Sequence, residues 1–481
     1  MIKNQKNRGL VLVQVLVFAV VAVVTLTGLI GWAGANIKAS RESFYREQAF
    51  EIAEAGIEYY RWHLAHNPTD FQDGTGASGP YIHAYYDKDG VRIGQFELTI
   101  TSPPVGSTIV DVKSKGLVDS YPSVYRKIEA KFAKPSFAKY AFVTNTDVAY
   151  GNGDIVYGPI HTNGGVAFYG TAIAYNTVSS ALTTYDDPDH SGSNEWAVHT
   201  HKAPVDPLPP TALPTRSDVF TAGRFLPVPV VDFNGITSDL SSIKTNAQAS
   251  GFYRSGSGGL GYLVVLKTND TFDLYKVTAL VAVPSNCTNI YSQSGWGTWS
   301  VNTKTLLGNY AIPANGLIFL EDHVWVEGQI NSARVTIGAG TFPASPATYK
   351  NIIVNNNLTY TNYDGQDVIS LIAQGSFYVG YVSADNLRID GAIIAQNGAA
   401  IRFYYQPASS GKTRCNAYAS RNSLTTYGMT ASNQRAYFAY SDGNGYATQP
   451  AYYDANLLYG PPPSFPLVSD QYQTISWQEI R

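Results

Sequence analysis

The alternation of apolar and polar positions changes period several times along this chain of 481 residues. The first distinct stretch is Leu10–Ala35, which contains no charged side chain and follows the basic residues Lys3, Lys6 and Arg8. As a helix it would measure roughly 39 Å at about 1.5 Å per residue, which exceeds the roughly 30 Å hydrocarbon core of a bilayer. The sequence therefore predicts one membrane-spanning helix here, and the basic residues before it predict a cytoplasmic N-terminus.

The helical pattern continues past this apolar stretch. No helix breaker occurs between Trp32 and Asn67-Pro68, and apolar residues recur at three- and four-residue spacing. These residues are Ala49, Ile52, Ala53, Gly56, Ile57, Tyr60 and Leu64. Such spacing gathers the side chains on one face of a helix. We therefore expect one continuous helix whose first half lies in lipid and whose second half lies outside the membrane.

Between residues 91 and 132 the period falls to two, which is typical of half-buried β-strands. Phe96, Leu98 and Ile100 alternate with polar residues, and prolines and glycines supply the turns between three predicted strands. We expect residues 1–133 to form a complete module in which a long helix packs on a small antiparallel sheet. Its parts are a leader over 1–9, the membrane segment over 10–35, and the outer helix with its sheet over 36–133.

The rest of the chain is low in charge and rich in Gly, Asn, Ser, Thr and Tyr. This composition suits extracellular β-structure, because the aromatic and β-branched residues can still form a core. Apolar triplets separated by glycines, such as Val324-Trp325-Val326 and Val335-Thr336-Ile337, are typical of the short strands of a β-solenoid. A β-sandwich is the competing interpretation. We expect β-rich coils and a proline-rich segment over 136–215, an inserted α+β element over 216–310, and a β-solenoid-like region over 311–481.

The predicted inserted element has a local pattern of its own. Leu240 and Ile243 lie at helical spacing, and Gly251 follows, which predicts a helix that ends at this glycine. The stretch Tyr262–Val277 predicts a hairpin that turns at Asn269-Asp270.

The N-terminal residues resemble a known family. The junction Arg8-Gly9-Leu10 with the uncharged helix after it, and the segment Glu47–Glu58 (EQAFEIAEAGIE), are similar to the N-termini of type IV pilin-like proteins, in particular PilX-type minor pilins. The resemblance implies that a prepilin peptidase cuts after Gly9 and that the new amine on Leu10 is methylated. It also implies that the apolar helix packs into a filament through Gln14, Leu16, Val20 and Val24.

Gln14 departs from the pattern of most major pilins, which carry glutamate at this position. That glutamate is thought to pair with the terminal amine of a neighbouring subunit, because a cation in lipid needs an anionic partner. Gln14 accepts a hydrogen bond but supplies no charge. Two interpretations stay open: a subunit at the filament tip, as in K-type pseudopilins, or a tolerated polar residue in a membrane helix.

A second resemblance lies near the end of the chain. The segments Ile389–Ala395 and Tyr453–Pro463, together with Trp477, resemble the C-terminal regions of large PilX-type exported proteins. This resemblance implies a non-catalytic β-helical region. The expected fold class is thus α+β with mostly β-structure: a long N-terminal transmembrane pilin helix with a small antiparallel sheet, then a large β-solenoid-like region with an inserted α+β element.

Candidate metal ligands are few. One polar loop contains Asp186, Asp187, Asp189 and His190. Its spacing does not match a calcium loop, so a solvated acidic loop is the favoured interpretation. His199 and His201 alternate and point to one face of a strand, but no third ligand is evident. We therefore predict no cofactor, and Asp186, Asp187 and Asp189 are kept only as weak candidates for binding a hard cation.

The number of cysteines and the net charge bear on two further questions, a disulfide bond and nucleic-acid binding. Cys287 and Cys415 are the only cysteines, and both a disulfide between them and two free thiols stay open. The net charge of −3 provides no bulk attraction to nucleic acid, so we do not expect nucleic acid as a partner.

No nucleophile elbow, phosphate loop or metalloprotease motif occurs in the sequence, so we expect no enzyme. We expect a minor pilin or pseudopilin-like structural subunit of a type IV pilus-like filament or its assembly machinery, with a large β-rich head for surface interaction or adhesion. The alternative is a membrane-anchored β-helix carbohydrate-active enzyme, because catalytic carboxylates from separate coils leave no local motif.

The expected partners follow from this function. They are other pilins or pilus assembly proteins, the prepilin peptidase, the membrane through one transmembrane helix, and a polysaccharide or host-surface ligand. The expected location is the cytoplasmic membrane with the N-terminus inside, and an extracytoplasmic or pilus-associated position after processing.

Overall fold

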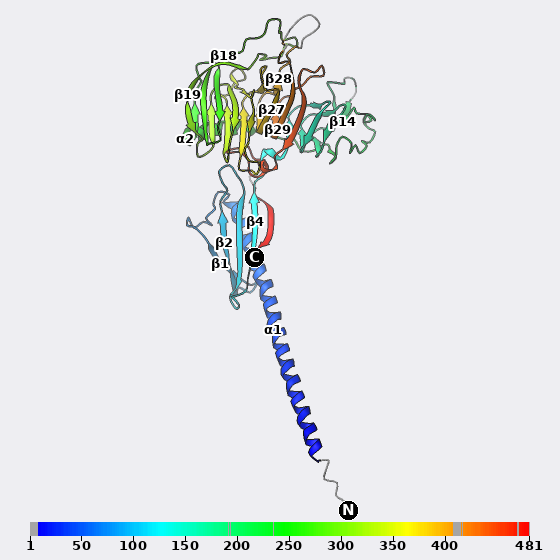
Figure 1. The fold of residues 1–481 in the computed structure, drawn as a ribbon, viewed down its shortest axis with the longest axis vertical. Helices are drawn as coiled ribbons and strands as arrows, with labels where there is room; N and C mark the ends of the chain where they lie inside the picture. The colour runs from blue at the N-terminus through cyan, green and yellow to red at the C-terminus, as the bar shows by residue number, and fades with distance from the viewer. Residues whose placement is uncertain are drawn as a thin grey trace, which may run out of the picture. The chain divides into compact units, whose positions relative to one another are not determined.

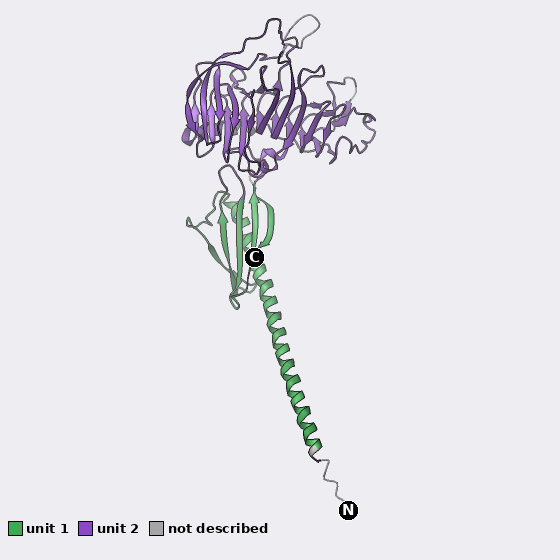
Figure 2. Cartoon of the chain, in the orientation of Figure 1, with its two compact units in different colours: residues 1–102, 110–133, 471–481 green, residues 103–109, 134–470 purple. Residues whose placement is uncertain are grey.

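The computed structural model describes residues 8–190, 192, 194–233, 235–406, 415, 417–468 and 471–480. The chain forms two compact units (Figure 2). The first, here called the helix–sheet unit, comprises residues 1–102, 110–133 and 471–481. The second, here called the head, comprises residues 103–109 and 134–470. The predicted fold class is confirmed, since a long N-terminal helix and a small antiparallel sheet accompany a large β-rich region (Figure 1).

Helix α1 (Arg8–His66) is one uninterrupted helix of 59 residues, as the spacing of its apolar positions predicts. Its two halves have different surroundings. Every residue from Leu10 to Arg41 is exposed. The seven residues predicted to share one face, from Ala49 to Leu64, are instead buried on the sheet.

The sheet of the helix–sheet unit has five antiparallel strands in the order β1-β2-β3-β4-β31. Their bounds are β1 Tyr81–Tyr86, β2 Arg92–Thr101, β3 Val110–Val118, β4 Tyr125–Ala133 and β31 Gln473–Ile480. Glycines let the helix approach the sheet closely: a Cβ atom on Gly116 would collide with the Ala49 carbonyl oxygen, and one on Gly56 would collide with Ser114. The core lies between helix and sheet.

The strand β31 differs from the sequence-based expectation. We expected a module complete by residue 133, and we placed the last residues in the region 311–481. The structure pairs β31 with β4 in antiparallel register, with Trp477 opposite Ala130. The head is therefore inserted in the chain between two neighbouring strands of one sheet. Most residues of β31 are exposed, as expected of an edge strand, so its sequence has no strong apolar alternation that would reveal its partner.

Parallel strands stack along the head in one continuous ladder, which is the arrangement of a β-solenoid. In spatial order its rungs are β16 (Phe252–Arg254), β20 (Leu317–Leu320), β22 (Arg334–Ala339), β25 (Val368–Ala373), β27 (Asn386–Ala395), β29 (Ser420–Ser432), β5 (Phe142–Thr144), β8 (Ile160–Thr162), β11 (Val178–Ser180) and β15 (Arg224–Phe225). Coils of this kind were expected over 311–481, and the stack in the structure also contains strands that precede residue 216.

The spatial order of these rungs is not the order of the chain. The chain enters the stack in its middle at β5, builds outward to β15, and then starts again at the opposite end with β16. It returns through successive coils to β29, where Thr430 pairs with Phe142. The points where the chain enters and leaves the head are consequently neighbours: the Ser136 amide donates to the Leu458 carbonyl at 2.8 Å, and the Phe137 amide donates to the Pro466 carbonyl at 2.9 Å.

Further parallel ladders complete the coils. One joins β6 (Val148–Tyr150), β9 (Val166–Phe168) and β14 (Val198–Thr200). A second joins β21 (Val324–Gln329), β23 (Ile352–Ile353), β26 (Phe377–Val379) and β28 (Ala400–Arg402). A third joins β24 (Leu358–Thr359), β27, β29, β30 (Gly445–Tyr453), β7 (Asp154–Tyr157) and β10 (Ile173–Ala174). Apolar side chains from these ladders fill the interior of the coils.

The predicted α+β element over 216–310 is not separate from the solenoid. Its helix α2 (Gly235–Ser250) buries Leu240 and Ile243 as predicted, and β17 (Gly261–Leu266) forms the predicted hairpin with β18 (Thr271–Leu280). However, β16 and β17 pair in parallel with β20 and β21. The antiparallel strands β18 and β19 (Val301–Ala311) continue from there, so this element caps one end of the stack.

Candidate functional site

The exposed apolar half of α1 is the first candidate site. Among the described residues, one helix is long and apolar enough to cross a membrane, and its span is Leu10–His66. The four predicted filament-packing residues are exposed on it: Gln14, Leu16, Val20 and Val24. Leu10 is exposed too, whereas most of the predicted leader lies outside the described residues. A contiguous apolar surface of this length needs a lipid or protein partner.

The two threonines inside this apolar half make hydrogen bonds within the helix. The Thr25 hydroxyl donates to the Val21 carbonyl at 2.9 Å, and the Thr27 hydroxyl donates to the carbonyl of Val23. Such bonds within the helix let hydroxyl side chains lie in an apolar environment at low cost. This half of α1 therefore has the chemistry of a membrane or filament helix.

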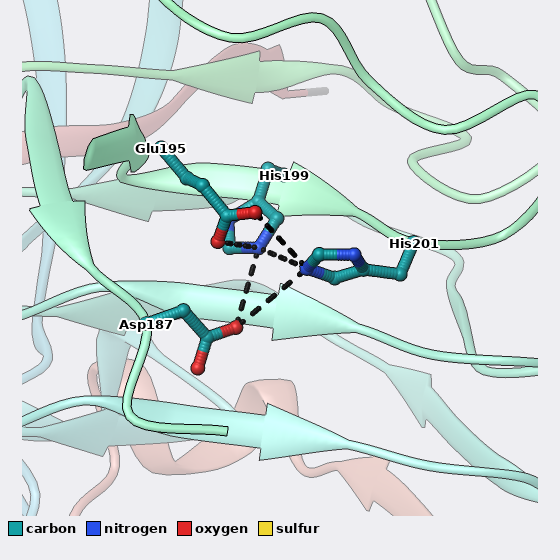
Figure 3. A group of neighbouring side chains, drawn as sticks. All are labelled: Asp187, Glu195, His199 and His201. Atoms are coloured by element: carbon teal, nitrogen blue, oxygen red, sulfur yellow. Dashed lines mark hydrogen bonds and ion pairs between the residues drawn. The ribbon is translucent and has the colours of Figure 1, made fainter. Parts of the chain in front are cut away.

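A second candidate site lies in the head, where Asp187, Glu195, His199 and His201 converge (Figure 3). Asp187 directly follows β12 (Thr184–Asp186), and Glu195 belongs to β13 (Asn194–Trp196). These two strands form an antiparallel hairpin. His199 belongs to β14, and His201 follows the end of that strand. Two histidines at alternate positions point to the same face, which brings both rings to the two carboxylates.

The ligand atoms of this cluster all lie within 4.8 Å of one another. The Nε2 atoms of His199 and His201 are 3.0 Å apart. Glu195 lies 3.1 Å from His199 Nε2 and 3.4 Å from His201 Nε2, and Asp187 Oδ2 lies 3.4 Å and 3.7 Å from the same two atoms. Asp187, Glu195 and His199 are buried, with exposed fractions of 1%, 5% and 2%, while His201 is half-buried. The cluster thus brings two carboxylates and two imidazoles out of solvent.

Surrounding groups orient these four side chains. The His199 Nδ1–H donates to the Trp196 carbonyl at 2.9 Å, and the Tyr169 hydroxyl donates to Asp187 Oδ2 at 2.5 Å. The ring of Tyr169 stacks on His201 with centroids 4.8 Å apart. Burial raises the pKa of the Asp187 carboxyl, but contact with His199, the Tyr169 hydroxyl and a backbone amide lowers it by more, so the net shift is downward. Burial, followed by the His199 charge, lowers the pKa of His201.

The residues of the predicted acidic loop have different surroundings in the structure. Asp187 enters the cluster, whereas Asp186 is exposed at the end of β12 and Asp189 pairs with Arg435. His190 contacts the Glu195 carboxylate at 3.1 Å from outside the four-residue set. We found no third ligand for the histidine pair from the sequence, because Glu195 reaches them only through the β12–β13 hairpin. The pairing of β12 with β13, which places Tyr185 opposite Glu195, was not predicted from the sequence.

A third candidate is a tyrosine-lined depression of about 420 Å³ in the head. It is lined by Tyr291, Gln293, Tyr404, Tyr437, Tyr440, Ser441 and Asp442. The Tyr404 hydroxyl donates to Asp442 at 2.5 Å, and the Gln293 side-chain amide donates to the Tyr440 hydroxyl at 2.9 Å. Nearby in the chain, Cys287 and Cys415 are joined in a disulfide with Cα atoms 4.7 Å apart. Aromatic faces beside polar groups suit a sugar or a polar peptide.

Two buried carboxylates on the coils bear on the alternative of a carbohydrate-active enzyme. Asp390 accepts hydrogen bonds from the Tyr360 amide at 3.0 Å and from the Tyr363 hydroxyl at 2.7 Å. Asp454 accepts from the Asn456 amide at 3.0 Å. Burial raises the pKa of both carboxyls. Their hydrogen bonds go to groups of the coils themselves, which is the pattern of structural carboxylates.

Comparisons with known proteins give few matches. No protein-family model matches the chain, and no curated protein matches it. Among solved structures, the chain is similar to the crystal structure of the competence-associated pilin ComZ from Thermus thermophilus. The two share 13% identical residues, with a TM-score of 0.33 over 91% of this chain and 97% of that chain.

Proposed function

We propose that this chain is a structural subunit of a type IV pilus-like filament or of its assembly machinery, of the PilX-type minor pilin or pseudopilin kind. The observation that supports this proposal is the single helix α1. Its exposed apolar half continues directly into an amphipathic half that packs on an antiparallel sheet. One surface of α1 can therefore contact lipid before assembly and the helices of neighbouring subunits afterwards.

Maturation follows from the same helix. A prepilin peptidase would remove the leader after Gly9, and the amine of Leu10 would become the methylated N-terminus. Gln14 supplies no charge for the amine of a subunit above it, which favours a position at the filament tip. Gln14, Leu16, Val20 and Val24 would contact neighbouring subunits through their exposed side chains.

The head would act outside the membrane by binding and not by turnover. Its tyrosine-lined depression presents aromatic rings together with the carboxylate of Asp442 and the amide of Gln293. Aromatic faces with polar neighbours can bind sugar rings, so the ligand in this proposal is a polysaccharide or a glycosylated host surface. Tyr291 is exposed at this depression, and Tyr291→Ala should weaken glycan binding.

The decisive experiment is N-terminal analysis of the protein in filaments from the native host. We expect a methylated Leu10 as the first residue. Gly9→Val should leave the leader attached, because the added side chain blocks a site that accommodates glycine. Asn4→Val, a matched change inside the leader but away from the junction, should be processed normally. Recovery of Met1 or Lys3 from assembled filaments would show that the proposal is wrong.

A further inference from the structure

We propose that Asp187, Glu195, His199 and His201 bind one divalent transition-metal cation, with Zn²⁺ as the preferred ion, in a structural site of the head. This site is independent of the filament role. Three observations support it: the spacing of the donor atoms, a buried oxygen without a hydrogen-bond partner, and the surroundings of the ligands.

The donor spacing matches tetrahedral coordination. Zinc binds imidazole nitrogen and carboxylate oxygen at roughly 2.0 to 2.2 Å, and the edges of such a tetrahedron measure roughly 3.3 to 3.6 Å. The separations that involve a histidine nitrogen run from 3.0 to 3.7 Å, and all four ligand atoms lie within 4.8 Å of one another. Ca²⁺ would require six to eight oxygen ligands, and Mg²⁺ prefers octahedral oxygen ligands. A set of two imidazoles and two carboxylates instead suits zinc and its neighbours in the periodic table.

The orientation of the histidines leaves a place for a cation. His199 donates its Nδ1 hydrogen to the Trp196 carbonyl, so His199 Nε2 faces His201 Nε2 and the two carboxylates. Glu195 Oε2 is buried and lies 3.1 Å from His199 Nε2, but it accepts no hydrogen bond in the part of the chain that the structure describes. Two imidazole nitrogens and two carboxylates thus meet in a buried position. A divalent cation at the centre would bind all four groups and would give the Glu195 oxygen a partner.

The surroundings resemble the outer shell of a metal site. A ligating histidine usually donates its second ring nitrogen to a carbonyl or carboxylate, as His199 does to Trp196. Ligating carboxylates are themselves hydrogen-bonded, as Asp187 is by the Tyr169 hydroxyl and the Asp189 amide. Tyr169 is therefore a positioning residue, which acts on the cation through Asp187.

Four protein ligands make a closed set, which is typical of structural rather than catalytic zinc. The hairpin of β12 and β13 pairs with no other described strand, and isolated two-stranded hairpins are marginally stable. A cation held by Asp187 and Glu195 from the hairpin and by two histidines at β14 would fasten the hairpin to the solenoid. Its binding energy would then contribute to the stability of the head.

Zinc binding to the full-length protein in detergent micelles tests this proposal. The protein is treated with EDTA, dialysed and reloaded with Zn²⁺, and bound metal is measured by mass spectrometry. We expect one Zn²⁺ per chain and a higher melting temperature of the reloaded protein. Reloading with Co²⁺ should give the intense visible absorption of a tetrahedral site. A chelated wild-type protein that takes up no stoichiometric Zn²⁺ and melts unchanged would overturn the proposal, whatever the variants do.

Variants test the assignment of the ligands. His199→Gln and His201→Gln should lose stoichiometric Zn²⁺ and the Co²⁺ absorption, whereas His190→Gln, a neighbouring histidine outside the set, should keep both. Tyr169→Phe removes only the hydroxyl that orients Asp187 and should weaken Zn²⁺ binding by about 10- to 100-fold. Tyr157→Phe, on an exposed tyrosine of the solenoid wall, should bind as wild type does. Loss of the Co²⁺ spectrum in His190→Gln with retention in His199→Gln would contradict the proposed set.

Discussion

The helix–sheet unit and the head differ in how their strands pair. In the helix–sheet unit, neighbouring strands β1 to β4 are also neighbours in sequence and pair in antiparallel fashion. In the head, each rung pairs in parallel with a coil that lies many residues away, and the rungs are not stacked in chain order. The difference shows that one sequence can specify both a locally connected core and a core that depends on long-range pairing.

The two units also use their apolar residues differently. The helix–sheet unit buries one face of the second half of α1 and leaves the first half exposed. The head encloses its apolar side chains within the coils and adds a covalent bond between Cys287 and Cys415. Destabilising changes in one core should therefore leave the other core unaffected. Calorimetry with hydrogen exchange by mass spectrometry can assign each unfolding transition to its unit.

The largest expected effect concerns the disulfide of the head. The bond closes a loop in which the cysteines are 128 residues apart. For a loop of that length the chain-entropy model gives up to about 5 kcal/mol of stabilisation. Replacing both Cys287 and Cys415 by Ser should lower the free energy of unfolding of the head by up to that amount. The free energy of unfolding of the helix–sheet unit should not change. Reductant added to the wild-type protein should reproduce the shift, and an unchanged head transition would contradict this prediction.

A smaller effect is expected in the core of the helix–sheet unit. Ile52 is fully buried between α1 and the sheet, and removal of such a side chain leaves a cavity. Ile52→Ala should destabilise this unit by about 2 to 5 kcal/mol without changing the head. Leu29→Ala on the same helix, at a residue that is 59% exposed, should change the unfolding free energy by less than about 0.5 kcal/mol. Equal effects of the two changes would mean that the halves of α1 do not differ as described.

The exposed half of α1 has its own test. Val21→Arg places a charge at the centre of the apolar stretch, which costs about 2.5 to 3.5 kcal/mol on insertion scales. The variant should leave the membrane fraction when cells are fractionated. Ile82→Arg introduces the same charge at an exposed residue of β1, and this variant should stay in the membrane fraction. If both variants associated with the membrane at the wild-type level, the hypothesis that the exposed half of α1 is a membrane anchor would be wrong.

The smallest expected effect is a dependence on pH in the head. Burial raises the pKa of Asp154 to about 6, against 3.8 for the free carboxyl, although a hydrogen bond from the Gly151 amide opposes the shift. The folded state therefore binds this proton more tightly than the unfolded state does. As a result, the free energy of unfolding of the head falls as pH rises from about 4 to 6, and it is constant at higher pH. Asp154→Asn should remove this slope and stabilise the head above pH 6 by about 1 to 2 kcal/mol.

The control for this pH effect is Asp270→Asn, at an exposed turn between β17 and β18 that asparagine tolerates because φ is 57° there. This variant should keep the wild-type pH slope. If Asp154→Asn kept the slope as well, another group would be responsible for it.

Local patterns predicted much of this fold. The periodicity of α1, the helix with Leu240 and Ile243, and the hairpin that turns at Asn269-Asp270 all follow from short-range sequence, and the structure contains all three. Glycine-separated triplets predicted the solenoid coils, since each coil repeats the same short strand. These features were predictable because side-chain period and turn chemistry are properties of neighbouring residues.

Long-range pairing was not predictable in the same way. Nothing local in β31 indicates that it pairs with β4, and nothing in β29 indicates that its next neighbour is β5. For the same reason, the sequence indicated the histidine pair of the candidate metal site but not the carboxylates that lie beside it. The alternation of His199 and His201 predicted a shared face, but Asp187 and Glu195 reach that face only through the geometry of a hairpin. An apolar pattern indicates that a strand is buried but does not identify its partner.

The position of β31 has a consequence for the order of folding events. Because the head lies between β4 and β31 in the chain, β31 is synthesised after every coil of the head. The sheet of the helix–sheet unit can gain its fifth strand only after the entire head has been translated. A chain that ends before β31 would keep an open edge at β4, with unpaired backbone groups that other strands can bind. Completion of this small sheet therefore requires that the whole head has been synthesised.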